Sequence, residues 1–202
     1  MMKQVSLLFY ILVLYSCKQN EAIKNDDVVL SNKRNHSAEL IEKEFLKYAD
    51  EAMVDSLKME LINAFNIYDD SFFKIVHIDA EALAEFSFDF FLPNLNTILA
   101  KRNSSLTVKK SNDNYDSFEV LINGQPIQLY TQLELDNDSF WNTAPINFFR
   151  KVNTILKAND SNEQFYLLYE GNDLHAILLT EDQFFIITDY YKDNFNERPY
   201  KP

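Results

Sequence analysis

The sequence predicts an α+β domain with a mainly antiparallel sheet, and two observations support this fold class. Apolar residues recur at helical spacing over a long segment near the N-terminus. Further along, strand-like segments follow one another across short polar turns that hold the chain's two glycines, Gly124 and Gly171. Strands joined by hairpins pair antiparallel, whereas strands that alternate singly with helices form parallel sheets.

A long N-terminal helix is the first element expected. Ser37 is a suitable N-cap, and Asp69-Asp70-Ser71 follows as a polar turn. The expected apolar face consists of Ile41, Phe45, Ala49, Ala52, Met53, Leu57, Leu61 and Ala64. This spacing predicts one helix that continues to about residue 64.

A first unit of helices and strands follows that helix. Residues 72–78 form either a buried strand or an apolar link. Asp79 can cap a helix over 80–91, and Pro93 can start a second helix that reaches about Arg102. The strands expected next are 106–110, 118–122 and 126–131, with a polar turn over 111–117 and a two-residue turn at Asn123-Gly124.

The second unit repeats this order of a helix followed by strands. A turn at 136–139 precedes a helix over about 145–158, with an earlier turn possible at Phe140-Trp141. The strands expected after it are 164–169, 174–180 and 184–188. The polar tail from Lys192 is expected to be loose.

Part of the second unit resembles the first at the level of residues. Asn96-Thr97-Ile98-Leu99 recurs as Asn153-Thr154-Ile155-Leu156, each with a phenylalanine five residues earlier, Phe91 and Phe148. Residues 118–124 with Ile127 likewise parallel residues 165–171 with Leu174. Two interpretations stay open: a decayed internal duplication, or two similar local structures.

The N-terminus has the order of an export signal. Lys3 precedes the apolar run from Leu7 to Leu14, which is too short to span a bilayer. Leu14-Tyr15-Ser16-Cys17 resembles the lipobox of bacterial lipoproteins. This resemblance implies cleavage after residue 16 and lipidation of Cys17. The alternatives are a cleaved secretory signal with an incidental cysteine, or a buried N-terminal helix.

The resemblance also implies a location and a division of the chain. Residues 1–16 would be the signal peptide, 17–35 the lipidated cysteine with a flexible tether, 36–191 one domain and 192–202 the polar tail. A lipid on Cys17 would hold the domain on the bacterial cell envelope. Lys18 follows the cysteine where an aspartate would favour the inner membrane, so the resemblance favours the outer membrane, on either face.

The charge restricts the class of partner. The net charge is −12, and it becomes −13 without residues 1–16, which contain Lys3 and no acidic residue. Such a chain repels phosphate backbones and anionic headgroups, which argues against nucleic acid and against membrane contact other than the lipid. It attracts a basic protein. The alternative interpretation is that the charge only keeps the domain soluble.

Catalytic and metal-binding motifs are not recognisable in the sequence. It contains no Gly-x-Ser-x-Gly elbow, no phosphate loop and no zinc spacing. The segments 112–116 and 136–138 resemble fragments of a calcium loop without its glycine and distal glutamate. His77 is more simply a core histidine. Asp173-Leu174-His175 could orient an imidazole for a cryptic hydrolase. We therefore expect no cofactor, no metal and no enzymatic activity.

Binding is the remaining class of function, and four turns combine acidic with aromatic side chains. Aromatic anchors bordered by charge are typical of protein interfaces, although turn-forming acids beside inward-facing aromatics give the same pattern. The sequence thus predicts a protein-binding module, of either an inhibitor or immunity type or an envelope assembly or scaffold type. The candidate surface consists of Tyr68, Asp69, Asp70, Asp136, Asp138, Trp141, Tyr169, Asp173, His175, Tyr190 and Tyr191.

Overall fold

The computed structural model describes residues 35–111 and 118–202. The predicted signal peptide, Cys17 and the tether up to residue 34 lie outside these residues, as does the turn at 112–117.

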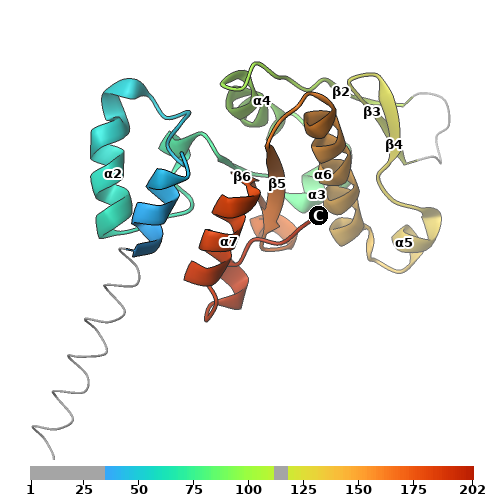
Figure 1. Cartoon of the computed structure of the whole chain (residues 1–202). Helices are drawn as coiled ribbons and strands as arrows, with labels where there is room; N and C mark the ends of the chain where they lie inside the picture. Colours follow the sequence, from blue (N-terminus) through green and yellow to red (C-terminus); the bar gives the residue numbers. More distant parts are fainter. Residues whose placement is uncertain (1–34, 112–117) are drawn as a thin grey trace, which may run out of the picture.

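The α+β class is confirmed, with two three-stranded antiparallel sheets (Figure 1). Their strand orders are β1-β6-β5 and β2-β3-β4. The strands are β1 Ile75–His77, β2 Val108–Lys110, β3 Glu119–Ile122, β4 Gln125–Gln128, β5 Glu163–Leu168 and β6 His175–Thr180. After a helical segment over 35–42, the α-helices are α2 Val54–Asn63, α3 Ala80–Ala84, α4 Leu92–Ala100, α5 Gln132–Asp136, α6 Phe140–Ala158 and α7 Glu181–Tyr190. Short 3-10 helices are η1 Glu51–Met53, η2 Asp70–Phe72, η3 Gly171–Asp173 and η4 Phe195–Glu197.

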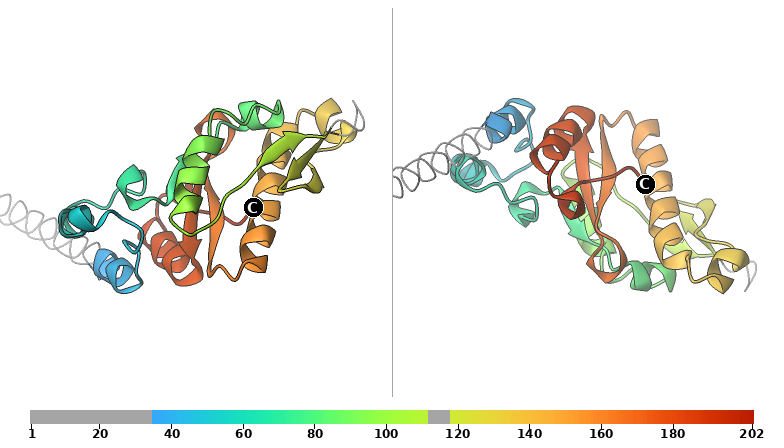
Figure 2. Two further views of the ribbon diagram at one scale, coloured as in Figure 1. Left: turned by 90° about the horizontal axis from the view of Figure 1, so that it is seen from above. Right: turned by 90° about the horizontal axis from the view of Figure 1, so that it is seen from below.

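The β1-β6-β5 sheet is buried on both faces. Successive strand residues point to opposite sides, so Phe165 and Leu167 of β5 enter one hydrophobic cluster and Tyr166 and Leu168 enter another. The first cluster joins the sheet to α3, α4, α6 and the β2-β3-β4 sheet. The second joins it to α7 and the N-terminal helices. Figure 2 shows the sheet between α6 on one side and α7 on the other.

The hairpin predicted at Asn123-Gly124 is confirmed. Both residues have positive φ, 49° and 77°, as a two-residue turn between twisted strands requires. The turn sets the pairing of β3 with β4, in which Ile122 lies opposite Gln125. The Asn123 side chain also accepts a hydrogen bond from the Thr107 N–H at 2.7 Å, which connects the turn to the segment that leads into β2.

The two asparagines of the repeated tetrapeptide make the same contact. The Asn96 amide donates to the Leu106 carbonyl at 3.0 Å and accepts from the Leu106 N–H at 2.7 Å. Asn153 does the same with Phe165, at 2.9 and 2.7 Å. Each asparagine side chain thus bonds both the N–H and the carbonyl of one residue, as the main chain of a neighbouring strand would. By this contact, β2 and β3 of the first unit correspond to β5 and β6 of the second. The sequence similarity instead matches residues 118–124, which contain β3, with residues 165–171, which contain the end of β5. The two alignments therefore differ by one strand.

Replacing Asn153 with alanine is expected to lower the free energy of unfolding by about 2–3 kcal/mol, because it leaves two polar groups of the buried Phe165 without partners. Urea unfolding at pH 7 measures this loss. The control is Asn162→Ala, at an exposed asparagine in the turn before β5, which should change stability by less than about 0.5 kcal/mol. Equal losses in the two variants would show that the two hydrogen bonds between Asn153 and Phe165 do not stabilise the fold.

The prediction of a single long N-terminal helix is wrong. The helical segment ends at residue 42, and Glu44 has a φ of 57°, which turns the chain. The turn buries Phe45 completely against the second cluster, and a new helix begins only at Val54. Packing of Phe45 therefore outweighs the continuous helical periodicity.

The helix predicted over 80–91 is shorter in the structure. Asp79 caps α3 by accepting a hydrogen bond from the Ala82 N–H at 3.1 Å, but α3 ends at Ala84.

The predicted strand 184–188 is also wrong, because this segment lies in α7. Thr180 accepts from the Gln183 N–H, and Gln183 accepts from the Thr180 N–H, both at 3.3 Å, which forms a capping box. A second capping box, Thr131 with Glu134, starts α5, which the sequence interpretation missed. Helix α6 begins at Phe140, five residues before the predicted start at Pro145.

The expectation of a loose tail is wrong as well. Tyr200 pairs antiparallel with Leu167 at the outer edge of β5, with hydrogen bonds of 2.8 and 2.9 Å. The Tyr200 hydroxyl donates to the Tyr169 carbonyl at 3.0 Å. The tail therefore protects an edge strand and helps to build the surface described next.

Candidate functional site

Side chains from distant segments meet at one end of the β1-β6-β5 sheet, and we call this surface the tyrosine–histidine face. Its side chains come from the segment before η2, from β1 and β6, from the turn after β5, from the segment before α4, and from η4 in the tail. Its members are Tyr68, His77, Phe90, Tyr169, His175 and Glu197.

Glu197 connects the two tyrosines of the face. Its carboxylate accepts a hydrogen bond from the Tyr68 hydroxyl and another from the Tyr169 hydroxyl, both at 2.6 Å. Burial and the bond to Glu197 raise the pKa of Tyr68, and the bond to Glu197 raises that of Tyr169. Both phenols therefore stay neutral and act as donors, which fixes the tail against the sheet.

The two histidines lie side by side on neighbouring strands. His77 and His175 are directly paired in the register of β1 and β6, and their ring centroids are 4.8 Å apart. His175 also packs edge-on against Tyr68, and His77 against Phe90. Burial lowers the pKa of His175, so this imidazole is neutral at pH 7. His77 is exposed, and the expectation of a core histidine is wrong.

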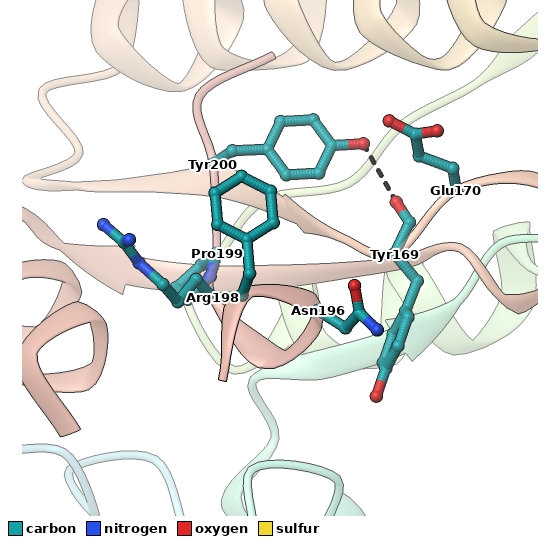
Figure 3. Close-up of a pocket in the computed structure, with 7 residues that line it drawn as sticks. Tyr169, Glu170, Asn196, Arg198, Pro199 and Tyr200 are labelled. Atoms are coloured by element: carbon teal, nitrogen blue, oxygen red, sulfur yellow. Dashed lines mark hydrogen bonds between the residues drawn. The ribbon is translucent and has the colours of Figure 1, made fainter. Parts of the chain in front are cut away.

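A hollow of about 630 Å³ adjoins the face, and we call it the tail hollow (Figure 3). Figure 3 shows Tyr200 reaching toward the Tyr169 carbonyl, with Glu170 beside its hydroxyl. Phe195 is 82% exposed at this hollow, and Phe90 is 52% exposed on the face. The lining residues are Tyr169, Glu170, Phe195, Asn196, Arg198, Pro199 and Tyr200.

Several residues of the predicted surface do come together here. Tyr68, Tyr169 and His175 belong to the face, and Asp70 and Asp173 are exposed close to His175. Asp69 instead forms the turn before β1, where its carboxylate accepts from the Ser71 N–H at 2.9 Å. The hydrogen bond between Asp173 and His175 joins the His175 ring Nδ1 to the Asp173 main-chain carbonyl, at 2.8 Å, and not to the Asp173 carboxylate. This geometry does not support an Asp–His catalytic pair.

The other predicted residues are more dispersed. Trp141 packs on Phe140 and lines a small hollow of about 40 Å³ that shares Glu170 and Tyr200 with the tail hollow. Tyr190 packs against Phe65, and Tyr191 joins the second hydrophobic cluster. Asp136 accepts a bond from Gln132 within α5, and Asp138 is a turn residue with φ of 54°. These two carboxylates line neither hollow.

Sequence reasoning missed Phe90, Glu197, Phe195 and Arg198. Three of these belong to the tail, which was expected to be loose. Phe195 and Tyr200 were the available signal, because aromatic residues are rare in segments that stay unfolded.

A buried titratable group with a shifted pKa also lies away from this surface. Lys74 is buried, and burial lowers its pKa to about 8 despite a 2.7 Å contact with Glu163. Its ammonium also donates to Gln183 and to the Leu178 carbonyl. Arg102 contacts the same Glu163 carboxylate at 2.6 Å. The side chains of this ion cluster are almost fully buried, and they connect the segments before β1 and after α4 to β5 and α7.

Two further kinds of feature are absent from the described ranges 35–111 and 118–202. No set of three or more His, Cys, Asp or Glu side chains there has the arrangement of a metal site. No helix in the same ranges has the length and apolar character needed to cross a membrane.

Comparison with known proteins places this chain in no group: no family model, no curated protein and no solved structure matches it.

Proposed function

We propose that this chain is a lipid-anchored envelope lipoprotein whose domain binds a protein partner through the tyrosine–histidine face and the tail hollow. The sharper form of the proposal is an inhibitor or immunity-type protein that neutralises a basic partner. One observation carries it: segments that are far apart in the sequence bring aromatic and acidic side chains to one surface that adjoins a hollow.

Exposed aromatic rings support binding at this surface. Phe195 and Phe90 are among the most exposed large apolar side chains of the described residues. Phe195 lines the tail hollow together with Tyr169, and Phe90 packs on His77. Glu197 fixes Tyr68 and Tyr169 through hydrogen bonds. Rigid aromatic anchors of this kind contribute a large share of the binding energy at protein interfaces.

The local charge supports a basic partner. Asp70, Glu170 and Asp173 are exposed around the face and the hollow, where Arg198 is the basic lining residue. The net charge of −12 adds long-range attraction for a cationic protein. Attachment of the chain to the membrane rests on the lipobox resemblance at Cys17.

A pull-down from envelope extract at low and high salt tests the proposal. We expect capture of a protein partner that weakens as salt rises, because screening reduces attraction between opposite charges. Phe195→Ala should lower the affinity for that partner about tenfold or more, as loss of an interface anchor does. Leu133→Ala is the matched control, since Leu133 is 68% exposed on α5 and lines neither hollow.

Three results would contradict the proposal. Failure to recover any partner from the relevant extract rejects the binding function, and recovery that ignores salt rejects its electrostatic form. A partner that Leu133→Ala weakens as much as Phe195→Ala binds elsewhere on the domain.

A further inference from the structure

We propose that His77 and His175 together bind a divalent transition-metal ion of the zinc, copper or nickel class. This inference stands independently of the proposed partner binding. It rests on three features of the histidine pair: the strand register, the hydrogen bonds of both rings, and the aromatic and acidic side chains around them.

The register brings the two side chains as close as neighbouring strands allow. The Ile78 N–H donates to the Leu174 carbonyl, and the Leu178 N–H donates to the Lys74 carbonyl. These bonds place the hydrogen-bonded pairs of β1 and β6 at alternate positions, so His77 and His175 form a pair without ladder bonds. Side chains of such pairs approach most closely. The ring centroids accordingly lie 4.8 Å apart with an interplanar angle of 32°.

The hydrogen bonds of the rings determine which nitrogens can bind a metal. His77 Nε2 lies 2.6 Å from the Asn172 carbonyl, and His175 Nδ1 lies 2.8 Å from the Asp173 carbonyl. A carbonyl oxygen only accepts, so each of these nitrogens carries the proton. In the neutral rings, His77 Nδ1 and His175 Nε2 are left with free lone pairs.

The hydrogen bonds of both rings match those of metal-binding histidines. A ligating imidazole usually donates its other N–H to a carbonyl or carboxylate, which fixes its tautomer and its orientation. Both rings of the pair already have that second bond.

The surroundings define the class of ion. Tyr68 and Phe90 pack edge-on against the rings, while the carboxylates of Asp70 and Asp173 attract a cation toward them. The described residues provide no third ligand within a metal cluster, so water would complete the coordination. Two imidazoles with water suit zinc, copper and nickel, whereas calcium and magnesium prefer oxygen ligands.

Metal titration of the full chain tests the site, with Cys17→Ser in every sample so that the thiol does not compete. We expect one Zn²⁺ ion per chain by calorimetry at pH 7.5, no response to Mg²⁺, and coupling to two nitrogens in the electron paramagnetic resonance spectrum with Cu²⁺. His77→Gln and His175→Gln should each weaken binding by roughly 10²-fold, because the second ligand acts at high effective concentration. His36→Gln is the control, since His36 pairs with Asp189 elsewhere.

Nitrogen-15 spectra of the unsubstituted histidines provide a measurement that does not depend on folding of the variants. Without metal, they should show protons on His77 Nε2 and on His175 Nδ1. Zn²⁺ should shift His77 Nδ1 and His175 Nε2 most strongly. The site is refuted if saturating Zn²⁺ leaves these two nitrogens unchanged, or if His36→Gln weakens binding as much as the paired variants do.

Discussion

Glu163→Gln is expected to lower the free energy of unfolding by about 3–5 kcal/mol, which is the usual cost of breaking a buried ion pair from one side. Glu163 is only 6% exposed, and its carboxylate contacts both Lys74 and Arg102. Glutamine keeps the shape but removes the charge that compensates both cations. Urea unfolding at pH 7 measures the loss, and Glu181→Gln, at an exposed position, is the control.

Lys74→Met should cost much less, about 1–2 kcal/mol, although Lys74 belongs to the same cluster. One carboxylate faces two cations, so Lys74 carries the surplus charge, in agreement with its pKa of about 8. Methionine fills similar volume without that charge, and Arg102 keeps its bonds to Glu163. A loss from Lys74→Met as large as that from Glu163→Gln would show that the cluster is a balanced pair instead.

The same ion cluster should make part of the unfolding free energy sensitive to acid. Burial alone would raise the pKa of Glu163, but the hydrogen bond from Arg102 and the charge of Lys74 outweigh it and hold the pKa below the ordinary value of 4.5. A lowered pKa adds stability that is complete above 4.5 and is lost as the pH falls through the folded-state value. Unfolding free energies measured from pH 5 to pH 3 should therefore fall less steeply in Glu163→Gln than in the unsubstituted protein.

Features fixed by neighbouring residues could be predicted from the sequence. The Asn123-Gly124 turn, the Asp79 cap and the start of α4 near Pro93 all depend on local backbone chemistry. The strand predicted at 184–188 failed because a short apolar run fits either a strand or a helix. The deciding signal was the Thr180–Gln183 capping box, which was present in the sequence.

The candidate site could be predicted only in part, for a related reason. Tyr68 and Tyr169 could be predicted because acidic and aromatic residues occur together at their turns, and His175 because Asp173 stands two residues before it. The pairing of His77 with His175 depends instead on the register between β1 and β6. Glu197 meets the tyrosines from the tail, which Tyr200 pairs with β5. Contacts of this kind come from tertiary packing, which has no local pattern.

Phe91→Ala and Phe148→Ala are each expected to lower the free energy of unfolding by about 3–5 kcal/mol, because each removes a large ring from a fully packed core. These are the corresponding phenylalanines of the two repeated segments. Their rings meet edge-on, with centroids 5.8 Å apart, in the cluster that joins both sheets. Phe90→Ala is a matched control one residue away, where the ring is 52% exposed and should contribute about 1 kcal/mol or less.

The double variant tests whether the two units depend on each other. If the rings stabilise one shared core, the combined loss should differ from the sum of the single losses by about 0.5–1.5 kcal/mol, the coupling found for aromatic pairs in contact. Unfolding should also remain a single transition when followed by circular dichroism and by Trp141 fluorescence. Additive losses with two separate transitions would mean that each helix-and-sheet unit folds on its own. In that case, the contact between Phe91 and Phe148 would be a junction between two independent cores.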